Sequence, residues 1–174
     1  MSGYSVWRHA VLMGMLAAAA RSDWPSGMWQ SMVSTGSPAL AHHDMAYDGG
    51  HGKLVLVGTD AMAWPRTNWP VYHGDSNLTW SAGGELPSGA GHDPEVAYAP
   101  SRGVTVVYTG TNVVWEYDGA SWSRIVAATM PVQCYDGAML EYDSARQEIV
   151  LVGCDQYPAT NAASETWSWN GTDW

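Results

Sequence analysis

Short apolar runs rich in β-branched residues recur along the chain, and each is bounded by glycine or by turn-forming residues. They cover residues 54–58, 104–108 and 149–153. A run of this length with such flanks predicts a β-strand, and a Tyr-Asp pair ahead of the first and third runs predicts a hairpin turn. The pattern therefore predicts strand pairs repeated along the sequence.

The repeat extends beyond these runs. Tyrosines at 47, 98 and 142 precede them, and tryptophans at 80, 122 and 174 close each segment. Both sets recur at intervals of about 40–50 residues, which is typical of a propeller with loops of unequal length. We expect most of these aromatic side chains to pack in the core.

Composition supports an all-β chain. Of its 174 residues only 14% are charged, while Gly numbers 19, Trp 11, Tyr 9 and Phe 0. Few charges with many glycines and large aromatics favour strands and tight turns over helices. The balance of 7 basic against 17 acidic residues, a net charge of −10, argues against nucleic-acid and anionic-membrane partners.

The N-terminal segment, residues 1–23, differs from the rest. Residues 10–20 form an apolar stretch after Arg8, which favours a short helix and also resembles the core of a secretory signal. No apolar run reaches the ~20 residues that a membrane helix needs. Localisation, cytoplasmic or secreted, stays open, and residues 24–174 are predicted to form the repeat domain.

Three motifs carry a resemblance to a known family: MAYD (45–48), LVLVG (54–58) and WEYDGASW (115–122). Together they resemble kelch repeats of the bacterial type related to the central propeller of galactose oxidases, over residues 29–174. The resemblance implies four-stranded blades, with the HDMAYD segment (43–48) as the innermost strand of the first. It does not carry over the copper chemistry, because the Tyr–Cys ligand set has no counterpart here.

In that register residues 29–33 are an outer strand with no blade before it, and the third blade lacks its own outer strand. Three blades cannot close a ring, since propellers have about 4–8. We therefore expect a homodimer that closes a six-bladed ring, each N-terminal strand completing the partner's last blade. A fragment that assembles in another way is the alternative.

Aspartates open each repeat at 44, 93 and 136, with histidines beside the first two at 43 and 92. If the inner strands line a tunnel, these residues form a ring at its mouth. Carboxylates and imidazoles are ligands for divalent metals. The predicted ligand set, with zinc favoured and calcium possible, is His43, Asp44, His92, Asp93 and Asp136. Alternatively, each aspartate only binds backbone groups.

Other polar positions are weaker candidates. Asp60, Asn112 and Asp155 each follow the second strand of a repeat and are expected to cap loops. Cys134 and Cys154 fall opposite one another in the third repeat. They could form a disulfide, join the metal site or be buried thiols.

Two function classes follow. The first is a metal-dependent hydrolase of phosphotriesters, lactones or esters, in which His42 or His43 acts as the base. The second is a kelch binding module for carbohydrate or protein, using surface tryptophans and long loops. A serine hydrolase is not supported, since no Gly-x-Ser-x-Gly motif occurs.

Overall fold

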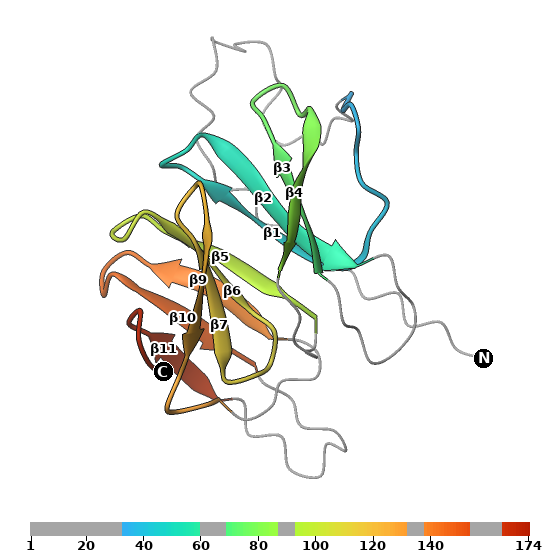
Figure 1. The fold of residues 1–174 in the computed structure, drawn as a ribbon. Coiled ribbons are helices and arrows are strands. Elements are labelled where there is room, and N and C mark those ends of the chain that lie inside the picture. Colours follow the sequence, from blue (N-terminus) through green and yellow to red (C-terminus); the bar gives the residue numbers. More distant parts are fainter. Residues whose placement is uncertain (1–32, 60–68, 87–92, 132–137, 154–164) are drawn as a thin grey trace, which may run out of the picture.

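The computed structural model describes residues 33–59, 69–86, 93–131, 138–153 and 165–174, which form three antiparallel β-sheets (Figure 1). No helix occurs within these ranges, so none of their segments is a helix able to span a membrane. The helix predicted within residues 1–23 lies outside them. The expected all-β class is confirmed.

Each sheet is a meander in which strands adjacent in the chain are hydrogen-bonded neighbours. The first sheet contains β1 (Ala41–Asp48), β2 (Lys53–Thr59), β3 (Trp69–Gly74) and β4 (Trp80–Leu86). The second contains β5 (Glu95–Ala99), β6 (Val104–Tyr108), β7 (Val113–Tyr117) and β8 (Trp122–Val126). The third contains β9 (Met139–Asp143), β10 (Glu148–Val152) and β11 (Thr166–Trp169).

These strands follow the repeat read from the sequence. The three apolar runs become β2, β6 and β10, and the tryptophans at 80 and 122 begin β4 and β8. The described part of the third sheet has three strands rather than four. Of the predicted outer strand at 29–33 only Val33 is described, and it lies in no strand.

Strand register aligns the first hairpins of the three repeats residue by residue from the repeat tyrosine onward. Tyr47 pairs with Leu54, Tyr98 with Thr105 and Tyr142 with Ile149. The intervening turns have equal length, and their fifth residue after the tyrosine has positive φ in each case: Gly52 (64°), Gly103 (66°) and Gln147 (61°). Counting from the tyrosine therefore identifies equivalent positions in the three sheets.

The turns also confirm the predicted Tyr-Asp signal. Asp48 accepts a hydrogen bond from the backbone N of His51 at 3.0 Å. In the third repeat Asp143 accepts from the backbone N atoms of Ala145 and Arg146, at 2.8 and 3.0 Å. These bonds satisfy donors that the turn leaves without a strand partner.

Two apolar cores join the sheets, and the middle sheet contributes to both. The first core lies between the first and second sheets and includes Val55, Val57, Val107 and Trp115. The second core lies between the second and third sheets and includes Val106, Tyr108, Leu151 and Trp169. Alternate residues of β6 thus point to opposite cores. Contacts between β1 and β5 and between β5 and β9 place the first strands of the sheets next to one another.

Candidate functional site

A β-bulge in β1 shapes the site predicted at the start of the first repeat. Ala41 is opposite Thr59 and Asp44 is opposite Val57, so β1 contains one more residue than β2 over this stretch. His42 takes up the extra length with a φ of 48°, in the left-handed region. Bulges of this kind redirect side chains out of the ordinary alternation.

The redirected His42 side chain reaches the second sheet. Its Nδ1 lies 3.0 Å from Oδ2 of Asp93, two residues before the start of β5. The Asp93 side chain is 9% exposed and that of His42 is 33% exposed. Two of the residues predicted to act together are therefore in direct contact, and the contact links the first sheet to the second.

Asp44 also links these sheets, through the backbone. Its Oδ2 accepts a hydrogen bond from the backbone N of Val96 on β5, at 2.8 Å. Asp44 thus binds a backbone group, which is the alternative to metal binding that the sequence left open for this aspartate. His43 is exposed and lies beside Gly58 of β2.

The described residues do not form a metal centre. Among them, no group of three or more His, Cys, Asp or Glu side chains is arranged to hold an ion. The other predicted ligands, His92 and Asp136, lie outside the described residues, as do Cys134, Cys154, Asp60 and Asp155. Asn112, the described member of the second set, is exposed, and its backbone O accepts from Ala127 N at 2.8 Å.

The predicted aspartates occupy different places in their repeats. Asp44 is three residues before Tyr47 and lies inside β1. The residue three positions before Tyr98 is Glu95, so Asp93 falls two residues outside β5. The start of β1 and the segment before β5 nevertheless meet, because the bulge turns the His42 side chain toward Asp93.

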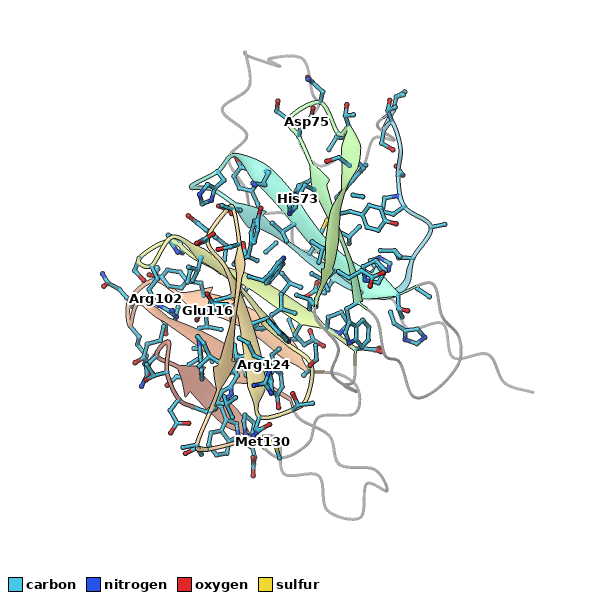
Figure 2. All side chains as sticks on the ribbon, in the orientation of Figure 1. His73, Asp75, Arg102, Glu116, Arg124 and Met130 are labelled. Carbon is cyan, nitrogen blue, oxygen red and sulfur yellow. The ribbon has the colours of Figure 1, made fainter. Side chains whose placement is uncertain are left out.

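A second polar arrangement, which the sequence did not indicate, lies on the second core. Arg102 donates from Nη1 to Oε1 of the buried Glu116 at 2.7 Å, and its Nη2 contacts Oε2 (Figure 2). The indole Nε1 of Trp169 also donates to Oε1, at 2.8 Å. The Glu116 carboxylate is thus satisfied by a cation on its own sheet and an indole on the next.

The Arg102 side chain lies against Gly171, where any larger residue would clash with it. A Cβ at Gly171 would lie 2.6 Å from Cζ of Arg102, and the φ of Gly171 is +104°. A side chain also lies against a glycine at the first core, where a Cβ at Gly119 (φ +94°) would lie 2.2 Å from Nε2 of His51. His51 and Arg102 are both four residues after the repeat tyrosine, the spacing that could have identified them from sequence.

On the first core, the position of Glu116 is occupied by His73. His73 is opposite Val55 in β2, as Glu116 is opposite Val106 in β6. Its ring centroid lies 5.3 Å from that of Tyr117. Burial, and secondarily the charge of Lys53, lower the pKa of His73, while Asp48 opposes the shift. Its Nε2 has no hydrogen-bond partner in the described structure.

No protein-family model matches the sequence, and no curated protein shows significant similarity to it.

Proposed function

We propose that the three sheets are blades of a kelch-type β-propeller. Three features support this architecture: each sheet is a four- or three-stranded meander, equivalent positions recur in all three, and the first strands adjoin one another. A propeller repeats such sheets radially, each packed on the next. The kelch motifs MAYD and LVLVG fall in β1 and β2 of the first sheet, and WEYDGASW joins β7 to β8 in the second.

We further propose that the chain is a non-catalytic interaction module with a protein partner. The observation that carries this proposal is an uncovered apolar patch on the third sheet. Met139 is 67% exposed and its cross-strand partner Val152 is 41% exposed. Paired apolar side chains on an open sheet face are typical of a surface that binds another protein.

A protein partner is favoured over a carbohydrate by the placement of the tryptophans. Within the described ranges none of them is an exposed residue. Trp69, Trp115 and Trp169 belong to the cores, and the others are half-buried. The indole rings of the described tryptophans therefore stabilise the fold, and none of these rings offers an exposed platform on which a sugar ring could stack.

The metal-dependent hydrolase is the second candidate, and the pair of His42 and Asp93 favours it. When Asp93 accepts the hydrogen of Nδ1, the neutral imidazole has its acceptor at Nε2, the arrangement of a general base. The strained φ of His42 is of the kind found at functional sites. The described residues fall short of a ligand set for zinc or calcium, so no step is assigned to a cation.

One experiment separates the two candidates. Hydrolysis of p-nitrophenyl acetate and paraoxon is measured for the full chain, with EDTA and with added zinc, for wild type, His42→Ala and Asp93→Asn. His51→Ala is the matched control, since His51 is also paired with an aspartate, Asp48, at 2.9 Å.

The interaction module predicts equal rates for all four proteins under every condition. A loss of about 100-fold or more in His42→Ala, with His51→Ala unchanged, would establish the hydrolase instead. Elemental analysis of the purified protein adds an independent readout of any resident metal.

A further inference from the structure

The chain contains two Asn-x-Thr sequences, and both lie in turns that the structure describes. Residues 77–79 (Asn-Leu-Thr) belong to the turn between β3 and β4, and residues 170–172 (Asn-Gly-Thr) directly follow β11. This tripeptide is the acceptor sequence for N-linked glycosylation and is expected in a surface loop. Two copies in one chain allow their side chains to be compared in the same fold.

The first turn is held together through its backbone. Oδ1 of Asp75 accepts hydrogen bonds from the backbone N atoms of Asn77 and Thr79, at 2.9 and 2.8 Å (Figure 2). The backbone O of Leu78 accepts another from the backbone N of Thr35, at 3.1 Å. These bonds fix the turn without using the side chain of Asn77 or that of Thr79.

Both of these side chains are open to an enzyme. Asn77 and Thr79 are exposed residues. Within the described part of the chain, nothing forms a hydrogen bond with the Asn77 carboxamide or with the Thr79 hydroxyl. The amide nitrogen that would receive a sugar and the hydroxyl that would be recognised are therefore both available in the folded protein.

The second turn uses the corresponding side chains for itself. Oδ1 of Asn170 accepts from the backbone N and the Oγ1 of Thr172, at 2.9 and 2.8 Å, and from the backbone N of Asp173 at 3.1 Å. The hydroxyl of this sequence thus donates to the carboxamide of the same sequence. An enzyme that recognises both groups has to break this turn first, which costs the turn its local hydrogen bonds.

The residue between them is also covered. The guanidinium of Arg102 lies against Gly171, where a Cβ would be 2.6 Å from Cζ of the arginine. Arg102 is itself bound to the buried Glu116. Opening the second turn therefore disturbs contacts of the second core, whereas the first turn presents its acceptor without any such change.

We propose that Asn77 is an acceptor for an N-linked glycan in the folded protein and that Asn170 is not. The donor is an oligosaccharide joined to a lipid diphosphate. A bond forms between Nδ2 of Asn77 and C1 of the first sugar, while the bond between C1 and the diphosphate oxygen breaks. The lipid diphosphate leaves, the amide nitrogen loses one proton, and nothing is oxidised or reduced.

This modification goes beyond the interaction module proposed above and does not depend on it. The glycan would stand on the β3–β4 turn of the first sheet, whereas the apolar patch of Met139 and Val152 lies on the third sheet. A glycan is bulky and solubilising, so it would keep the β3–β4 turn free of protein contacts and leave the patch to the partner.

The test is glycosylation of the purified, folded full chain by an oligosaccharyltransferase supplied with a lipid-linked oligosaccharide. A peptide N-glycosidase then removes the glycan and leaves Asp in place of the modified Asn. The two acceptor sequences fall in different tryptic peptides, because Arg102, Arg124 and Arg146 lie between them. We expect one glycan, with the conversion to Asp at residue 77 only.

Four variants distinguish the two sequences. Asn77→Gln and Thr79→Ala should both lose the modification, and Thr79→Ser should retain it because the hydroxyl is kept. Asn170→Gln is the matched control and should be modified as wild type is. Asn77→Gln keeps the backbone N that binds Asp75, so its circular dichroism spectrum should not change.

The melting temperature provides a second measurement. Because Asn77 is exposed and its carboxamide takes no part in the turn, the glycosylated chain should melt within about 2 °C of the unmodified chain. A larger fall would show that the fold does not accommodate the glycan and would overturn the proposal. A folded wild type that stays unmodified while a synthetic acceptor peptide is modified also overturns it, as does modification of Asn170 at the same rate as Asn77.

Discussion

The two apolar cores use one position of the repeat in opposite ways. On the second core this position is Glu116, which accepts from Arg102 and from Trp169 Nε1. On the first core it is His73, which stacks near Tyr117 and has no partner for Nε2 in the described structure. Tyr117 and Trp169 are themselves equivalent residues, so the two contacts superimpose.

The difference shows which part of the repeat determines the packing. Both cores have apolar residues at alternate positions of β2, β6 and β10. The polar residue beside them differs, being His73 in the first core and Glu116 in the second. A buried polar group is tolerated when its own partners are present, as around Glu116. Where a partner is missing, as at Nε2 of His73, burial lowers the pKa of the group and makes the core sensitive to pH.

The second core should lose most when its carboxylate is removed. Glu116→Ala leaves the Arg102 guanidinium and the Trp169 indole without their acceptor, and breaking such a pair costs about 3 kcal/mol of unfolding free energy. Urea denaturation at neutral pH measures this loss. Glu116→Gln, which keeps an acceptor for the indole, should lose clearly less. Equal losses in the two variants would show that the ion pair alone matters.

The first core should respond to pH instead. Because the pKa of folded His73 lies below the ordinary 6.5, the unfolded chain binds more protons as pH falls through that value. Stability contributed by neutral His73 is therefore complete above pH 6.5 and is lost as pH drops. His73→Phe should abolish this part of the dependence, measured as the difference in Tm between about pH 7.5 and about pH 5.5.

His43→Phe is the matched control, since His43 is exposed, and it should keep the wild-type dependence. A wild type and a His73→Phe variant with parallel pH profiles would contradict the assignment. The difference in stability between wild type and His73→Phe is expected to be smaller than the loss of stability in Glu116→Ala. The reason is that Phe also removes a buried nitrogen that has no hydrogen-bond partner at neutral pH.

The repeat made much of the fold predictable. Each strand-forming run begins six or seven residues after a repeat tyrosine, so β2, β6 and β10 and their hairpins follow from the repeat. The pairing of His42 with Asp93 did not follow, because it depends on a bulge that only the register with β2 reveals. Alignment of motifs matched Asp44 with Asp93, whereas strand register matches Asp44 with Glu95.

The contacts of Arg102 were also beyond sequence reasoning. Arg102 lies in the turn between β5 and β6, 14 residues from Glu116 on β7, and Trp169 belongs to another repeat. Their meeting depends on how the second sheet packs on the third. An arginine four residues after a repeat tyrosine was visible, but nothing in the sequence indicated its acceptor.

The contact between His42 and Asp93, which joins the first and second sheets, should have the smallest effect on the free energy of unfolding. The His42 side chain is 33% exposed, so solvent screens the pair and the expected coupling is about 0.5–1 kcal/mol. A double-mutant cycle with His42→Ala, Asp93→Asn and their combination, read by urea denaturation, measures this coupling directly. Asp44→Asn outside the pair should add independently to either single variant if each aspartate ties the sheets by its own bond. A coupling near zero would mean that the strained backbone at His42 is held by the bulge rather than by Asp93. The bulge would then be the feature that distinguishes the first core, and the histidine would be one of its consequences.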